Sequence, residues 1–203
     1  MSEQLIITVG REFGSGGHVI AETLAKKFHL PLYDSNLLRK IATDKEISPE
    51  ELEKYDEIPK NRLFSRTIRG YSNSPEENIA NMQFKYLRER AELGESFVVV
   101  GRCSETILKG YHGLITVIVL EDKACKIKRI MDIKGISEIE ADIMLNYQDK
   151  QRKTYHNYYC NIKWGDSRNY DISVNSSRLG IEGTADMLES YIKARIMHDE
   201  YGK

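Results

Sequence analysis

The sequence predicts a single α/β domain over residues 1–203, in which helices cover both faces of a parallel β-sheet. Three observations support this fold class. Apolar, β-branched runs recur without polar alternation, as in strands that are buried on both faces. Stretches of helical pattern separate these runs, which is typical of a sheet with crossover connections. A glycine-rich turn, from Gly14 to Gly17, lies between the first run and the first helical stretch.

The expected strands and helices alternate along the chain. The last helix has the clearest pattern, because Ala185, Leu188 and Ile192 recur at helical spacing. The expected strands are residues 5–9, 30–33, 97–100, 115–120 and 172–174, and the expected helices are residues 18–28, 35–45, 75–93, 103–109, 122–132 and 182–197.

Two polar regions, residues 46–93 and 137–168, interrupt the alternation. Both are rich in charged residues, largely helical in pattern, and placed between expected strands. We therefore expect two insertions above the edge of the sheet, where such segments close over substrates and exclude water. Surface helices or a dimer contact would produce the same pattern.

The composition is that of an ordinary globular protein. Lys and Arg total 30 and Asp and Glu total 31, so no overall positive field favours nucleic acid or an anionic membrane. The cysteines, Cys103, Cys125 and Cys160, lack metal-ligand spacing and indicate reduced thiols. Since no targeting segment or membrane span is visible, we expect a cytoplasmic protein with no nucleic-acid or membrane partner.

The glycine-rich turn predicts a phosphate site. Glycines let backbone N–H groups approach an anion, and the N-terminus of the following helix adds positive potential. The turn nevertheless lacks the lysine of a complete G-x-x-x-x-G-K-[ST] loop. A tight strand-to-helix turn without a ligand is the alternative.

Four segments together resemble cytidylate kinase and the cytidylate kinase-like family of nucleoside monophosphate kinases. They are Gly14 to Gly17, residues 32–35 with Arg39, Gly101-Arg102 after the strand at 97–100, and the basic segment 150–153. The resemblance runs through most of the chain. It implies a P-loop kinase-like parallel sheet flanked by helices, with 46–93 as the helical acceptor-binding insertion and 137–168 as a lid. It also implies ATP and Mg²⁺ as cofactors.

On the donor side, the phosphate loop departs from the family pattern. Gly17 stands in the place of the lysine that offsets charge on the β- and γ-phosphates, and Arg11 stands in the place of the first glycine. We hypothesise that Arg11 replaces the lysine, because a guanidinium group can clamp two phosphate oxygens. By resemblance, the residues that bind ATP are Gly14, Ser15, Gly16, Gly17 and His18, with Ser176 near the adenine.

On the acceptor side, the resemblance assigns arginines to the acceptor phosphate. Arg102 directly follows a strand, at the carboxyl edge where ligands of parallel sheets gather. The family carboxylates beside it are replaced by Val100 and Cys103, which leaves Glu105 as the nearest acid and a weak candidate for a metal ligand. A capping or solvent-facing Glu105 is the alternative. The candidate acceptor-binding residues are Asp34, Arg39, Gln83, Arg102 and Arg129.

Several of these candidates also have plain structural interpretations. Asp34 is suited to capping the next helix, and Arg39 and Gln83 are equally suited to exposed positions. Arg152 in the lid is the second candidate catalytic residue after Arg11, because lid arginines of the family close on the transferring phosphoryl group. A solvated charged helix face is the alternative for this segment.

The expected function is therefore a nucleoside-monophosphate-type kinase. It transfers the γ-phosphoryl group of ATP to a small phosphate acceptor such as CMP, and its partner is a nucleotide or a small phosphorylated metabolite. Two alternatives stay open: a kinase-like protein that binds or senses a nucleotide without turnover, and a kinase for a non-nucleotide metabolite. The missing lysine favours the first of these alternatives.

Overall fold

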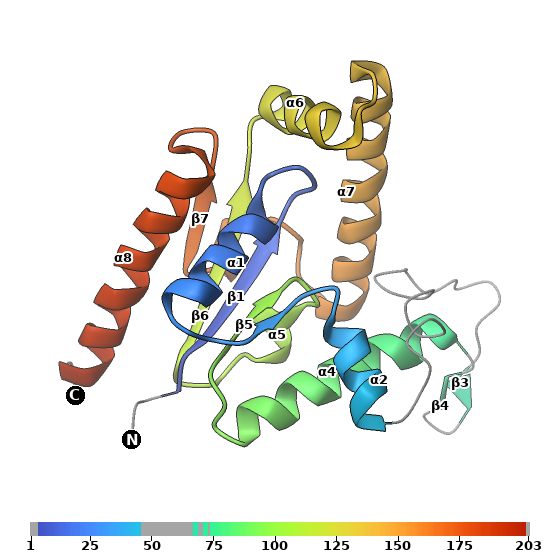
Figure 1. Ribbon diagram of the computed structural model, residues 1–203. Coiled ribbons are helices and arrows are strands. Elements are labelled where there is room, and N and C mark those ends of the chain that lie inside the picture. The colour runs from blue at the N-terminus through green and yellow to red at the C-terminus, as the bar shows by residue number, and fades with distance from the viewer. Residues whose placement is uncertain (1–3, 46–66, 69–70, 73, 202–203) are drawn as a thin grey trace.

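The computed structural model describes residues 4–45, 67–68, 71–72 and 74–201 (Figure 1). Its main sheet has five parallel strands in the order β2-β5-β1-β6-β7, which confirms the predicted fold class. These strands are β1 (Ile6–Arg11), β2 (Leu32–Tyr33), β5 (Phe97–Val100), β6 (Leu114–Leu120) and β7 (Ile172–Asn175), and a separate antiparallel pair consists of β3 (Thr67–Ile68) and β4 (Tyr71–Ser72).

The described helices connect and cover these strands (Figure 1). They are α1 (Gly17–Lys27), α2 (Leu37–Lys45), α4 (Pro75–Glu92), α5 (Ser104–Ile107), α6 (Lys123–Lys134), α7 (Glu138–Cys160) and α8 (Gly180–Tyr201), with a short 3-10 helix at Ser167–Asn169. None of the helices described is both long and apolar enough to cross a membrane.

The sheet separates two apolar cores. Along β5, Phe97 and Val99 pack with residues of α2 and α4, whereas Val98 and Val100 pack with residues of α1 and α8. Successive side chains of a strand point to opposite faces, so a strand between two helical layers needs apolar residues at every position. The absence of polar alternation in the sequence follows from this burial.

The strand order places the phosphate loop at the centre of the carboxyl edge. The chain passes from β1 to the β2 edge of the sheet and later from β5 to β6 on the other side of β1. The direction of winding therefore changes beside β1, and ligands of open parallel sheets bind at such a switch point. The turns that follow β1 and β5 meet there.

The second inserted region contains α7, which runs along this edge of the sheet (Figure 1). Its first turn is a capping box, in which Ser137 accepts from the backbone N–H of Glu140 and the Glu140 carboxylate accepts from that of Ser137. Ala141 and Leu145 then pack with Ile130 of α6. In the first inserted region, residues 46–66, 69–70 and 73 lie outside the described residues, and α4 begins at Pro75 after the N-cap residue Ser74.

Replacing Phe97 tests the core beneath β2 and α4. Phe97 is fully buried and its ring lies 5.1 Å from that of Tyr33. We expect Phe97→Ala to lower the free energy of unfolding by about 3–5 kcal/mol, because the substitution leaves a cavity. Urea denaturation followed by circular dichroism measures the change. Ile143→Ala is the control, because this side chain is 64% exposed and its loss should cost less than about 0.5 kcal/mol.

Candidate functional site

The phosphate loop joins β1 to α1 and depends on glycine backbone geometry. Gly14 and Gly16 have φ of 78° and 72°, in the left-handed region that glycine enters without steric cost. At Gly16 a side chain would also collide with Ile181, whose Cδ1 would lie 2.8 Å from the added Cβ. Because α1 begins at Gly17, its first N–H groups face the loop.

Two buried serines hold the loop in place by hydrogen bonds to its backbone carbonyls. The hydroxyl of Ser15 donates to the carbonyl of Glu12 at 2.9 Å, and that of Ser176 donates to the carbonyl of Ser15 at 2.9 Å. Both serines are fully buried. Ser176 therefore connects the loop to the segment after β7, and it also lines a groove beside α6.

Arg11 and Gly17 are packed directly against each other. A Cβ built on Gly17 would lie 2.5 Å from the Cβ of Arg11 and 3.3 Å from that of Val119. In protein structures, a Cβ atom essentially never lies less than 3.0 Å from a heavy atom of a residue that is not its chain neighbour. A lysine at the position of Gly17 therefore has no room while Arg11 ends β1.

A cavity of about 770 Å³ opens beside the loop. It is lined by the loop, α1, the segment after β2, the turn after β5, α6 and α7, so segments far apart in the sequence form one site. Among the candidate residues, it brings together Arg11, Gly14, Gly16, Gly17, His18, Asp34, Arg102, Arg129 and Arg152.

The turn after β5 positions Arg102 through an unusual backbone conformation. Arg102 and the next residue, Cys103, have φ of 61° and 54°, so two consecutive non-glycine residues are left-handed. Arg102 is only 3% exposed, and its Nη2 donates to the carbonyl of Asp34 at 3.4 Å. The Asp34 carboxylate accepts from the backbone N–H of Asn36 at 2.8 Å and lies 3.6 Å from Nε2 of His18. Asp34 therefore combines a capping-type contact with a place in the cavity.

The helix α7 is docked on the phosphate loop. The backbone N–H of Phe13 donates to Asp149 at 2.7 Å, and the Arg152 guanidinium lies 5.6 Å from the centre of the Phe13 ring. The buried ammonium of Lys126 lies 2.8 Å from Glu12 and 3.7 Å from Asp149. Burial raises the pKa of Asp149. Lys126 and Asp149 thus join α6, α7 and the loop, although no local sequence pattern pairs them.

Arg129 contacts the phosphate loop directly. Its guanidinium donates to the carbonyl of Gly14 and to both carboxylate oxygens of Glu121, one of them at 2.7 Å. It also lines the groove beside Ser176. Arg129 makes these contacts because α6 presents this face to the phosphate loop, and Arg129 also lines the large cavity.

Two other candidates are not among the residues that line the cavity. Arg39 is exposed in a separate groove with Tyr33 and Tyr86, because the apolar residues of α2 pack on the sheet and turn Arg39 outward. Gln83 is fully buried within the packing of α4. Neither residue lines the large cavity formed by the described residues, and their expected roles stay predictions.

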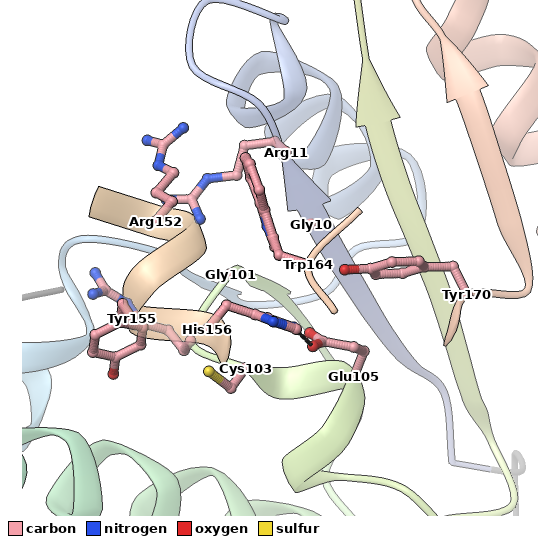
Figure 2. A pocket seen from close by; sticks show the side chains of 11 residues that line it. Gly10, Arg11, Gly101, Cys103, Glu105, Arg152, Tyr155, His156, Trp164 and Tyr170 are labelled. Carbon is pink, nitrogen blue, oxygen red and sulfur yellow. Dashed lines mark hydrogen bonds and ion pairs between the residues drawn. The ribbon is translucent and has the colours of Figure 1, made fainter. Parts of the chain in front are cut away.

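A second, much smaller cavity of about 20 Å³ shares Arg11, Arg102 and Arg152 with the large one (Figure 2). Glu105 and His156 line it, and His156 Nε2 lies 2.6 Å from Glu105 Oε1. The other lining residues are Gly10, Gly101, Cys103, Tyr155, Trp164 and Tyr170.

The pKa values of His156 and Cys160, two residues of this cluster, are strongly shifted. Burial opposes protonation of His156, but hydrogen bonds to Cys160 and Glu105 outweigh it and raise the pKa of His156 to about 10. A hydrogen bond from Cys103, followed by that from His156, lowers the pKa of Cys160 to about 6 against the effect of burial.

Glu105 is neither a helix cap nor solvent-facing, because it is buried and lies inside α5. Its contact with His156 links positions 51 residues apart, which no local pattern predicts.

The five-stranded parallel sheet, the glycine cradle at its switch point and the surrounding helices define a P-loop kinase-like protein. The model of the cytidylate kinase-like family matches residues 6–178, and the chain belongs to this family. The resemblance stated from the four sequence segments is therefore confirmed. Among curated proteins, none matches the sequence.

Solved structures agree on the fold. An uncharacterized protein from Eubacterium ventriosum is 39% identical, with a TM-score of 0.75 over 94% of this chain and 99% of that one. Shikimate kinase from Bacteroides thetaiotaomicron is 15% identical, with a TM-score of 0.55 over 93% and 98% of the two chains. A sugar kinase from Janibacter sp. is 14% identical, with a TM-score of 0.56 over 94% and 95%.

The packing of Arg11 against Gly17 predicts energetic coupling between the two positions in a double-mutant cycle. In the wild-type background, we expect Gly17→Ala to destabilise by about 1–3 kcal/mol, because the new methyl group overlaps Arg11. In an Arg11→Gly background, the same change should cost less by at least about 1 kcal/mol, because the overlap with Arg11 is gone, alanine favours a helix over glycine, and only the Val119 Cβ at 3.3 Å stays close.

Urea denaturation of the wild type, both single variants and the double variant measures this coupling. Equal effects of Gly17→Ala in both backgrounds would contradict the steric interpretation. Gly94→Ala and Gly110→Ala show how alanine behaves at left-handed glycines where an added Cβ meets no atom within 4 Å.

Proposed function

We propose that this protein is a kinase that transfers the γ-phosphoryl group of ATP to a small phosphate-bearing acceptor, with CMP as the first compound to test. The observation that carries the proposal is the convergence of Arg11, Arg102 and Arg152, from three separate elements, on the cavity beside the phosphate loop. Phosphoryl transfer requires positioning and charge stabilisation more than covalent chemistry. Glycine N–H groups and three guanidinium groups can provide both.

On the donor side, the backbone N–H groups from Gly14 to Gly17 bind the phosphates of ATP at the start of α1. Arg11 offsets the charge that develops during transfer, in place of the usual lysine. The support for this role is steric as well as chemical, since the Cβ of Arg11 occupies the space that a side chain on Gly17 would need.

On the acceptor side, Arg102 binds the acceptor phosphate and Arg152 closes on the transferring group. The burial of Arg102 favours this role, because an arginine in a site shielded from water interacts more strongly with an anion. The contact between Asp149 and the Phe13 N–H holds α7 over the loop. That position excludes water, which would otherwise compete as the acceptor.

The donor set at the large cavity fits Mg²⁺, the usual companion of ATP. Mg²⁺ prefers oxygen ligands and is commonly held by one or two carboxylates together with phosphate oxygens. Asp34 is a buried carboxylate that lines the cavity and would hold the ion, whereas Glu12 is paired with Lys126. The ion would neutralise charge on the phosphates. Glu105 fits this role poorly, because it lines the smaller cavity and accepts from His156.

A kinase for a non-nucleotide metabolite is the second candidate. It is favoured by the burial of Gln83, the residue expected to read the base, away from the described cavity. Structural neighbours named as shikimate kinase and sugar kinase share the fold. Balanced charge and three free cysteines support a cytoplasmic enzyme that acts on nucleotides or small phosphorylated metabolites rather than on nucleic acid.

Arg11 provides the kinetic test. With ATP, Mg²⁺ and the best acceptor from a panel of nucleoside monophosphates and phosphorylated sugars, we expect Arg11→Ala to lower kcat about 10²–10³-fold, since it removes a preorganised charge. Arg11→Lys should retain part of the activity. A coupled assay of ADP release measures both. Lys193→Ala is the control, because this exposed lysine on α8 pairs with Glu189.

An exchange of the two residues gives a sharper test. Arg11→Gly alone should lose activity, and Gly17→Lys alone should be poorly folded because of the overlap with Arg11. The double variant Arg11→Gly/Gly17→Lys should recover activity relative to Arg11→Gly, since it restores the usual order of glycine and lysine. ATP binding without turnover by any acceptor would instead identify a nucleotide-binding protein. Unchanged kcat in Arg11→Ala would exclude the role of Arg11.

A further inference from the structure

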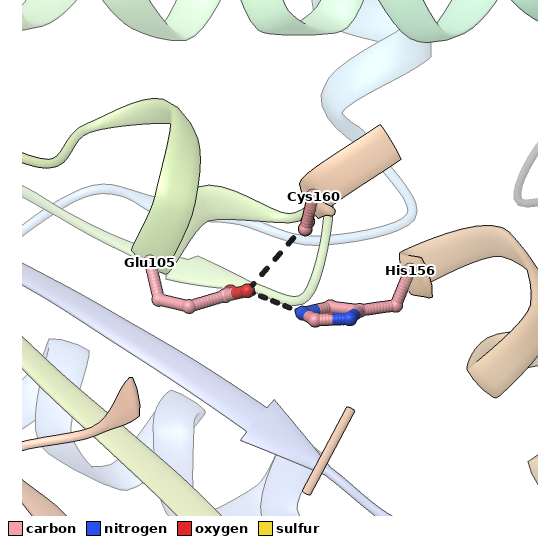
Figure 3. Close-up of side chains that lie close together, drawn as sticks. All are labelled: Glu105, His156 and Cys160. Carbon is pink, nitrogen blue, oxygen red and sulfur yellow. Dashed lines mark hydrogen bonds and ion pairs between the residues drawn. The ribbon is translucent and has the colours of Figure 1, made fainter. Parts of the chain in front are cut away.

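Three side chains with metal-binding chemistry, those of Glu105, His156 and Cys160, lie close together (Figure 3). Glu105 lies on α5, and His156 and Cys160 lie near the C-terminal end of α7. Glu105 Oε1 is 2.6 Å from His156 Nε2 and 3.9 Å from Cys160 Sγ. The three ligand atoms all lie within 4.8 Å of one another, and all three residues are buried.

We propose that Glu105, His156 and Cys160 bind one Zn²⁺ ion at this junction of α5 and α7. A carboxylate oxygen, an imidazole nitrogen and a thiolate sulfur are the donors that Zn²⁺ accepts in proteins. The thiolate and imidazole argue against Mg²⁺ or Ca²⁺, which prefer oxygen ligands. The proposal concerns a different set of donors from the phosphate site and does not depend on kinase activity.

The backbone presents these donors in a suitable arrangement. His156 and Cys160 are four residues apart on a continuous helix, so their side chains lie on the same face. In a tetrahedral zinc site, neighbouring ligand atoms are about 3.3–3.8 Å apart, as the metal–ligand distances require. The observed separations of 2.6 and 3.9 Å lie on either side of this range. To admit the ion, His156 and Glu105 would release the proton that they share, and the distance between Nε2 and Oε1 would widen from 2.6 Å to about 3.3 Å.

A second buried cysteine packs near these three side chains but is not one of the ligands. Cys103 is 3% exposed and lies in the same apolar cluster as Cys160, yet it does not belong to the group whose ligand atoms lie within 4.8 Å of one another. The three donors therefore leave the fourth position of a tetrahedral site to a water molecule or another small ligand. Glu105 and His156 are 51 positions apart, which explains why spacing alone gave no metal-binding signal.

The arginines around the site limit the net charge that the ion and its ligands can carry together. Arg11, Arg102 and Arg152 line the same small cavity as Glu105 and His156, so an uncompensated dication would be repelled. Glu105 and a Cys160 thiolate provide two negative charges, and a neutral His156 adds none. The occupied site is thus neutral beneath the arginines. Binding of the ion would fix the end of α7 against the turn that carries Arg102.

Cobalt substitution tests this site, because tetrahedral Co²⁺ bound by thiolate absorbs strongly and replaces Zn²⁺ in such sites. The full-length protein is stripped with a chelator and titrated with Co²⁺. We expect one Co²⁺ per chain, with a thiolate charge-transfer band that Zn²⁺ removes and a large excess of Mg²⁺ does not. Cys160→Ser and His156→Gln should each weaken Co²⁺ binding by about 10²-fold or more, beyond the effect of losing an outer contact. Cys125→Ser, which changes an exposed cysteine, should leave the spectrum unchanged.

Wild-type protein alone can overturn the proposal. Absence of the thiolate band, or its removal by Mg²⁺, would show that the cluster is only a hydrogen-bonded ion pair of His156 and Glu105. An undiminished band in folded Cys160→Ser would also contradict the assignment. Because the readout is a spectrum rather than turnover, these outcomes are distinguishable from failure of the kinase function.

Discussion

The packing of Arg11 against Gly17 is the constraint on which the phosphate site depends. Arg11 ends the central strand and Gly17 begins the first helix, so their contact sets how strand, loop and helix meet. A side chain on Gly17 would occupy the space of the Arg11 Cβ. The absence of a lysine and the presence of an arginine are therefore one structural change. Because Arg11 takes the place of the first glycine when Gly17 takes the place of the lysine, a cation still lies beside the loop. The missing lysine by itself would suggest that the loop has lost its function.

The loop is also held by charges that come from outside it. Arg129 binds the carbonyl of Gly14 and the carboxylate of Glu121, and Lys126 binds Glu12 while facing Asp149. An uncompensated buried lysine would cost several kcal/mol, so the two carboxylates that face Lys126 stabilise it by their charge. Since one of these carboxylates belongs to α7, the conformation of the phosphate loop is coupled to the position of that helix.

The sequence predicted those features that have a local cause. Unbroken apolar runs predicted strands covered on both faces, and the glycines predicted the cradle, because burial and backbone freedom act position by position. The directions of Arg39 and Gln83 depend on which helix face the sheet covers, and this is a property of packing. The contacts of Lys126 with Asp149 and of Glu105 with His156 join distant positions. Part of the expected acceptor insertion, residues 46–66, lies outside the described residues.

One face of α7 contacts α6, the phosphate loop and α5 in turn. Leu145, Asp149, Arg152, His156 and Cys160 recur every three or four residues, which places them on one side of the helix. The chemistry of this face changes along its length: it is apolar against α6, charged against the phosphate loop, and carries the proposed metal ligands His156 and Cys160 against Glu105 of α5. The sequence shows no regular apolar pattern along this face, because each turn of the helix contacts a different neighbour. Since a continuous helix moves as a unit, binding at either of the last two regions biases the position of the other.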